Sequence, residues 1–175
     1  MKSRALAVVV LAFGSVLQPA LSGAAPIDPA PELALCRGKP LHMAALSRIS
    51  TQARAAPEGQ RLTVQLSPDK TVSLPGTSPD FEKARAKTKG ATYAGLVRLV
   101  VTRPGTYRVG VAQDAWVDIA TATGKLLDAG PDEGTFTCDG AQKVLLYRLT
   151  AADTYWLQIA LFPRRETMLT IVRGD

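Results

Sequence analysis

Apolar and polar residues alternate along much of the chain after residue 60, and this period of two predicts β-strands. The stretch RLTVQL at 61–66 places Leu62, Val64 and Leu66 on one face. Similar stretches follow at intervals of roughly 8–12 residues, separated by turns and by one long loop at 130–142. We predict further strands at 71–74, 93–101, 106–111, 115–120, 126–129, 143–149, 154–161 and 167–172. Short strands without alternating long helices are typical of an all-β protein, here an antiparallel β-sandwich.

One turn-and-strand phrase occurs twice, 48 positions apart, as TRPGTYRVGV at 102–111 and TAADTYWLQI at 150–159. In both copies a four-residue turn precedes Thr-Tyr, and apolar residues then recur at every second position. The phrase therefore predicts two hairpins of the sandwich. Because side chains alternate between the two faces of a strand, we expect Tyr107 and Tyr155 to enter the core just after each turn. Their hydroxyl groups can then reach the loop backbone.

The chain before residue 61 shows no such alternation. Residues 25–40 are rich in proline, and we expect extended chain there rather than regular structure. For 41–56 a short helix opened by Pro40 is one alternative, and for 79–90 a short helix and a loop are both open. At most one or two short helices are therefore expected. The predicted organisation is a signal peptide at 1–24, an N-terminal arm at 25–60 and a β-sandwich domain at 61–175.

The first 24 residues have the order of a secretory signal peptide: Lys2 and Arg4, an apolar run at 5–17, and then small residues. Cleavage is expected after Ala24. The apolar run is shorter than the roughly 20 residues of a membrane span, so we expect no transmembrane segment in the mature chain. A lipoprotein signal ending at Cys36 fits less well, because a bulky residue precedes that cysteine. The expected location is periplasmic or secreted.

Two cysteines follow the signal peptide, Cys36 and Cys138. In an oxidising compartment an even pair usually forms a disulfide, so we predict a bond between them. A reactive or metal-binding thiol is the less favoured alternative, because the chain has no C-x-x-C motif.

The net charge of the whole chain is +6, and removal of Lys2 and Arg4 with the signal peptide lowers it by two, to +4. The remaining basic residues are dispersed along the sequence. A nucleic-acid-binding protein concentrates such residues on one face or along one groove. The sequence therefore predicts no nucleic-acid partner.

Side chains suited to catalysis or metal binding are few and scattered. The chain has one histidine, His42, beside Met43, and a lone His-Met pair is more often a surface feature than a copper site. An acidic segment lacks the Asp-x-Asp-x-Asp-Gly order of a calcium loop; its carboxylates are Asp128, Asp132, Glu133 and Asp139. Nucleophile-elbow, phosphate-loop and dinucleotide motifs are missing from the sequence. We predict no catalytic residue, no metal and no cofactor.

Polar and aromatic side chains share the outward positions of several predicted strands. If Val117 and Ile119 face the core with Tyr107, both tryptophans point outward among amide, carboxylate and guanidinium groups. Such surroundings are typical of a sheet face that binds sugars or peptides. The candidate binding face consists of Arg108, Trp116, Asp118, Arg148, Trp156 and Gln158. In the alternative, the N-terminal arm or the 79–90 segment covers the rings.

Four short segments recur as a set between residues 91 and 172: Gly-Thr-Tyr-Arg-Val at 105–109, Trp-Val-Asp at 116–118, CDGAQK at 138–143 and Tyr-Trp-Leu-Gln at 155–158. Through these segments the region resembles a family of small exported bacterial proteins. The region is also similar to the pre-peptidase C-terminal type of jelly-roll sandwich, which accompanies secreted enzymes and is not itself catalytic. Members of the first family often carry the label homogentisate 1,2-dioxygenase. A non-haem iron oxygenase needs two histidines and a carboxylate on the metal, and this chain has one histidine.

These features predict an exported, non-catalytic binding or accessory protein of the periplasm or cell envelope, whose partner is an envelope protein or a glycan. The alternative is a small secreted enzyme, either a hydrolase or, as the family label has it, an oxygenase. Titratable residues that converge in one pocket would favour the enzyme, and a flat aromatic face would favour binding.

Overall fold

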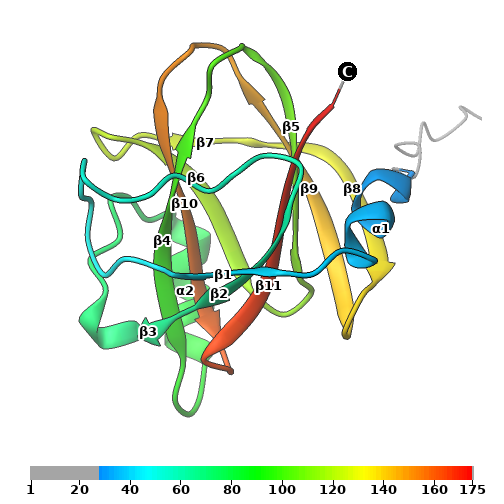
Figure 1. Ribbon diagram of the computed structural model, residues 1–175. Helices are drawn as coiled ribbons and strands as arrows, with labels where there is room; N and C mark the ends of the chain where they lie inside the picture. Colours follow the sequence, from blue (N-terminus) through cyan, green and yellow to red (C-terminus); the bar gives the residue numbers. More distant parts are fainter. Residues whose placement is uncertain (1–27, 175) are drawn as a thin grey trace, which may run out of the picture.

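The computed structural model describes residues 28–174, without the side chains of 131–133, and consists of two β-sheets packed face to face (Figure 1). The predicted signal peptide at 1–24 lies outside the described residues. Helical elements of the described chain are α1 (Ala30–Cys36), the 3₁₀ helix η1 (Asp69–Thr71) and α2 (Pro79–Lys87). The prediction of a mostly β protein built as a sandwich is confirmed.

The six-stranded sheet has the strand order β1-β2-β11-β5-β9-β8. Its neighbouring strands are antiparallel, except that β1 runs parallel to β2. The strands are β1 (Leu41–Ala44), β2 (Arg61–Gln65), β5 (Gly105–Ala112), β8 (Ala129–Thr137), β9 (Ala141–Leu149) and β11 (Glu166–Gly174). This order makes β1 and β8 the two edge strands of the sheet.

The five-stranded sheet has the order β3-β4-β10-β6-β7 and is antiparallel throughout. Its strands are β3 (Ser67–Pro68), β4 (Tyr93–Val100), β6 (Trp116–Thr121), β7 (Leu126–Leu127) and β10 (Thr154–Phe162). Only Leu66 separates β2 from β3, and only Asp128 separates β7 from β8. The chain therefore crosses directly from one sheet to the other at two places.

The main core lies between the sheets and includes the two repeated tyrosines. Tyr107 and Tyr155 are each 4% exposed. Each hydroxyl donates to the carbonyl four residues earlier, that of Arg103 at 2.9 Å and that of Ala151 at 3.3 Å. The prediction that each ring enters the core after its turn and that its hydroxyl reaches the loop backbone is confirmed.

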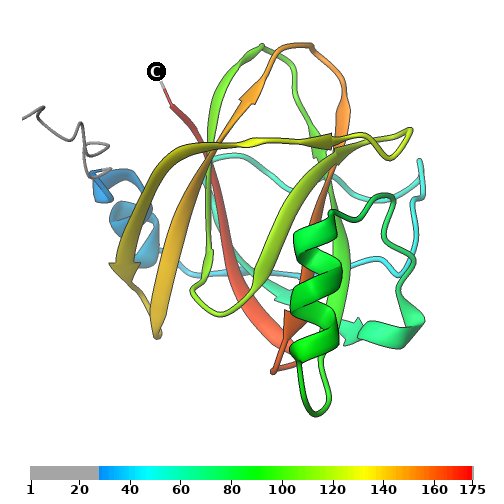
Figure 2. The same cartoon turned by 180° about the vertical axis from the view of Figure 1, so that it is seen from behind.

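One helix lies on the outer face of each sheet. The α1 helix contacts β8 and β11 of the six-stranded sheet, at the right of Figure 1. The α2 helix lies over the five-stranded sheet, in front of it in Figure 2. The Ser78 hydroxyl accepts the Phe81 N–H at 3.1 Å and Pro79 occupies the first turn, so α2 has a well-capped start. Of the two alternatives for 79–90, the structure has the helix.

The N-terminal segment differs from its prediction. Residues 25–40 were expected to be extended, yet they contain α1, because Pro31 lies in the first turn, where its missing N–H breaks no helical bond. The short helix considered for 41–56 is wrong: the segment begins with β1, whose Leu41 and Met43 pack against the main core. The arm at 25–60 thus supplies an edge strand to the sandwich.

Two further stretches differ from their predictions. The strand expected at 71–74 is instead the end of η1 and an irregular segment. Its apolar residues Val72 and Leu74 pack against the outer face of the five-stranded sheet. The loop expected at 130–142 is a hairpin of β8 and β9. Asp139 and Gly140 both have positive φ, 56° and 123°, in its turn. Asp-Gly is a favoured hairpin turn, so this signal was present in the sequence.

Candidate functional site

The residues predicted to form one binding face lie on two different sheets. The outer face of the five-stranded sheet carries Trp116 and Asp118 on β6 and Trp156 and Gln158 on β10. The outer face of the six-stranded sheet carries Arg108 on β5 and Arg148 on β9. The prediction of a single shared face is therefore wrong. Alternation along a strand separates inward from outward positions, but it does not determine which sheet the strand joins.

Trp156 and Gln158 are buried, each 1% exposed. The Gln158 side-chain amide bonds the backbone of Gly76 twice, accepting its N–H at 3.3 Å and donating to its carbonyl at 3.0 Å. Position 76 requires glycine, because a Cβ there would collide with the carbonyl of Gly124. Neither Trp156 nor Gln158 is open to a ligand in this structure.

Trp116 is partly covered by α2. The Phe81 ring of that helix meets the Trp116 ring edge-on, with centroids 5.6 Å apart and planes at 68°. Around them pack Val72, Leu74, Ala94, Ala160 and Leu161. The outer face of the five-stranded sheet thus carries a second small core, and the 79–90 segment covers part of Trp116, as one of the two predicted alternatives had it.

Asp118 is bound to the neighbouring tryptophan. Its carboxylate accepts the Trp116 Nε1–H at 2.7 Å. Burial raises the pKa of the Asp118 carboxyl above its ordinary value of 3.8, because a poorly solvated site disfavours charge. The bond from Trp116 and the positive charge of Lys143 lower the same pKa and oppose this effect. The carboxyl thus orients an aromatic ring of the outer layer.

Replacing Asp118 with asparagine is expected to stabilise the protein at neutral pH. Because the folded-state pKa is raised, the stability that the protonated carboxyl contributes is lost as pH rises above 3.8. Asparagine keeps an acceptor for Trp116 and has no charge to desolvate. Thermal melts at about pH 4 and pH 7 should show that the melting temperature of the variant rises relative to that of the parent as pH rises. A variant that is equally destabilised at both pH values would contradict this account.

Arg108 holds α1 on the outer face of the six-stranded sheet. Its Nε and Nη2 donate to the two carboxylate oxygens of Glu32, both at 2.8 Å, and Nη2 also donates to the Asp28 carbonyl. The Glu32 side chain is 0% exposed and that of Arg108 14%. The hydrogen bonds with Glu32 raise the pKa of the Arg108 guanidinium against the opposing effect of burial. Arg148, on the same face, is exposed.

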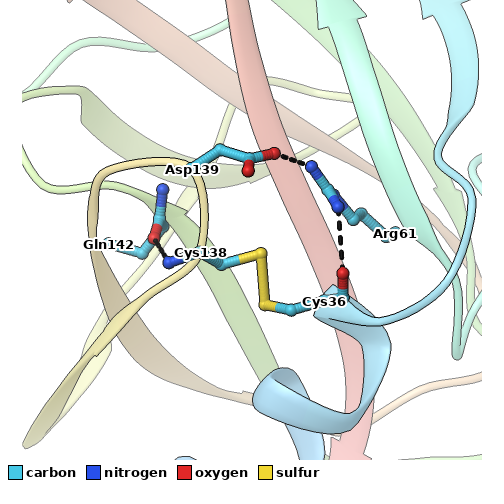
Figure 3. Close-up of a disulfide and its surroundings, with 5 residues drawn as sticks. All are labelled: Cys36, Arg61, Cys138, Asp139 and Gln142. Atoms are coloured by element: carbon cyan, nitrogen blue, oxygen red, sulfur yellow. Dashed lines mark hydrogen bonds and ion pairs between the residues drawn. A yellow bond between two sulfur atoms is a disulfide. The ribbon is translucent and has the colours of Figure 1, made fainter.

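The Cys36–Cys138 disulfide fastens the end of α1 to the β8–β9 hairpin (Figure 3). The prediction of this bond is confirmed, with the two Cα atoms 5.8 Å apart. Arg61 of β2 donates to the Cys36 carbonyl at 3.0 Å and forms an ion pair with Asp139. The Cys138 N–H donates to the Gln142 side chain at 2.8 Å. Both partners of the disulfide are therefore held by further bonds.

Four hollows border β1 or the residues beside it. The largest, about 500 Å³, lies between α1, the chain leading into β1 and the turn before β2. Hollows of about 170 and 180 Å³ share His42, Met43 and Ala44; the first extends toward β4 and the second toward β2 and β11. A fourth, about 270 Å³, lies beyond Ala44 and is bordered by Tyr93. Sequence reasoning missed this site, because it gave 41–56 no strand.

The residues considered for metal binding remain apart. His42 is exposed on β1, Asp128 lies between β7 and β8, and Asp139 lies in the hairpin turn. Within residues 28–174, side chains of 131–133 excepted, no three His, Cys, Asp or Glu gather closely enough to hold a metal ion. None of the helices in that part of the chain combines the length and the apolarity needed to cross a membrane.

Comparison of the chain with protein-family models, with curated proteins and with solved structures found no match. The resemblance of residues 91–172 to small exported bacterial proteins therefore stays a prediction.

Proposed function

We propose that this protein is an exported, non-catalytic binding or accessory protein of the periplasm or cell envelope, and that it holds its partner along β1. The observation that carries the proposal is the group of hollows around an edge strand. One side of β1 pairs with β2, and no strand of the described chain pairs with its other side. The open edge ends at Ala44, because Leu46 bonds Leu96 of β4. Such an edge offers backbone donors and acceptors to another chain.

A protein partner is supported better than a glycan. Sugar-binding faces rely on exposed aromatic rings. Here Trp156 is buried, and Trp116 is engaged by the Phe81 ring and by the Asp118 carboxylate. An extended polypeptide instead matches a strand edge with hollows on both of its sides, because its side chains alternate.

The α1 wall of the largest hollow is held by contacts within the protein itself. The α1 helix, which borders the largest hollow, is held by the Cys36–Cys138 disulfide and by the buried pair of Glu32 with Arg108. Arg61, in the same wall, bonds the Cys36 carbonyl. A site with fixed walls loses less conformational entropy on binding.

Export is supported by the disulfide, since such bonds persist in oxidising compartments, and by the predicted signal peptide. We further propose that the sandwich is of the jelly-roll or pre-peptidase C-terminal type, which accompanies other proteins without catalysing a reaction.

Site-specific photo-crosslinking in the native host tests the proposed function. A photoreactive amino acid in place of His42, on β1, is expected to yield one discrete adduct with an envelope protein. The same amino acid in place of Arg148, also exposed but on the outer face of the six-stranded sheet, is the matched control and should yield none. Equal adducts from both positions, no adduct from either, or retention of the protein in the cytoplasm would each contradict the proposal.

A further inference from the structure

The excess positive charge of the chain is concentrated around β1. The segment 37–61, which runs from the end of α1 through β1 to the start of β2, contains five Lys or Arg and one Glu. All other residues after 24 contain 14 Lys or Arg and 14 Asp or Glu, so their charges cancel. Basic residues thus occur along the whole sequence, but the net positive charge comes from this one segment. Arg61 of this segment is paired with Asp139, and Glu166 lines the hollow that extends from β1 toward β11. The positive charge that attracts an acidic partner therefore lies on the side of β1 that faces β4.

The hollow of about 170 Å³ beside β1 is the most specific part of this surface. It is lined by the basic residues His42, Arg54 and Arg98 together with apolar residues such as Leu96, and none of the described residues that line it is acidic. Arg98 donates one terminal N–H to the Ala53 carbonyl at 2.9 Å, whereas its Nε is buried without a hydrogen-bond partner. A carboxylate entering this hollow would meet the guanidinium groups of Arg54 and Arg98.

The backbone of β1 is oriented to receive a further strand. The Ala45 N–H donates to the Gln65 carbonyl of β2 at 2.8 Å. In an extended chain the N–H and C=O of successive residues point to opposite sides, so those of Ala44 and His42 point away from β2. Both residues are exposed. On the same side, the N–H and C=O of Leu46 already bond Leu96 of β4, both at 2.9 Å. The backbone groups available for another row of sheet hydrogen bonds are therefore those of His42 and Ala44, which line the basic hollow.

We propose that β1 binds an extended, acidic segment of the partner protein as an added strand, with an Asp or Glu side chain of that segment in the hollow formed by His42, Arg54 and Arg98. This inference rests on the proposed function and specifies its partner. Backbone pairing provides affinity in such strand addition, and pockets for alternate side chains provide specificity. The carboxylate accounts for the charge of the surface, and the free edge accounts for the extended conformation.

Three synthetic peptides of about nine residues, a common strand length, test the inference by calorimetry and backbone NMR on the protein from residue 25 onward. The first alternates glutamate with valine, the second has lysine in place of glutamate, and the third is the acidic peptide with N-methylated amides. The acidic peptide is expected to bind and to shift the β1 amide resonances. The lysine peptide and the N-methylated peptide should each bind at least about tenfold more weakly, a difference of about 1.4 kcal/mol.

Charge-reversal variants provide the matched comparison. Arg54→Glu should weaken binding of the acidic peptide at least about tenfold, whereas Arg148→Glu, the same change at an exposed position away from β1, should not. Both side chains are exposed, so thermal melts of the two variants should match the parent. Equal losses in both variants, or equal affinity for the acidic and lysine peptides, overturn the assigned carboxylate site. If no peptide binds while position 42 still crosslinks to an envelope protein, strand addition is wrong and the proposed function stands.

Discussion

Replacing both Cys36 and Cys138 with serine is expected to lower the free energy of unfolding by about 4–5 kcal/mol. The disulfide closes a loop between residues 102 positions apart and so restricts the conformations of the unfolded chain. Without the bond the unfolded chain gains conformational entropy, which favours unfolding. Urea denaturation of the oxidised parent and the double variant measures the difference. Hydrogen exchange should also show α1 opening more readily, because the bond joins the end of that helix to the β8–β9 hairpin.

Reductant provides the control for this comparison. It should bring the parent down to the stability of the double variant and leave the variant unchanged. If the oxidised parent and the variant unfold at the same urea concentration, the bond contributes nothing to stability. The contacts of Glu32 and Arg61 would then suffice to hold α1.

Most strands of the C-terminal half were predictable because apolar residues recur at every second position on their core-facing side. In β5 the core positions alternate from Tyr107 to Val111, and in β10 they alternate from Tyr155 to Ile159, before an irregularity. The repeated Thr-Tyr phrase places a large ring in the core of each strand. Local sequence and tertiary packing point the same way there, so the period of two is enough.

The elements around β1 were not predictable in the same way. The β1 strand has four residues, too few for a period to stand out, and it is a strand because β2 pairs with it. The β8 strand contains Gly130, Pro131 and Gly134, which local preference assigns to loops, but β9 pairs with Ala129 and, after an irregularity, with residues 133–137. Pairing with distant residues overrides local preference in both.

The candidate binding face shows a further limit of pattern reasoning. The outward positions of Trp156 and Gln158 were identified, but what covers them was not. The cover of Gln158 includes Gly76, which is 82 positions away in the sequence and whose backbone bonds the Gln158 side-chain amide twice. A stretch of irregular chain has no period from which such a contact can be read.

Replacing Arg108 with methionine is expected to lower the free energy of unfolding by about 3–5 kcal/mol, because it leaves the Glu32 carboxylate buried without its partner. Replacing Glu32 with methionine should lower the free energy of unfolding by a similar amount, since the Arg108 guanidinium then loses its two hydrogen bonds to the carboxylate. The double variant should recover most of the loss, because two apolar side chains of similar volume have no charge to desolvate. Urea denaturation of the four proteins gives the coupling energy.

Arg148→Met is the matched control, because Arg148 lies on the same outer face of the same sheet and is exposed. It should change stability by no more than about 0.5 kcal/mol. A large loss of stability from Arg108→Met and a small one from Arg148→Met would show that Arg108 holds α1 on the sheet rather than contacting a ligand. Because α1 borders the largest hollow, Arg108 then supports the wall of that hollow. Equal, small losses at the two positions would mean that the Glu32 pair does not hold the helix. Arg108 would then again be a candidate for binding, on a face that α1 can leave.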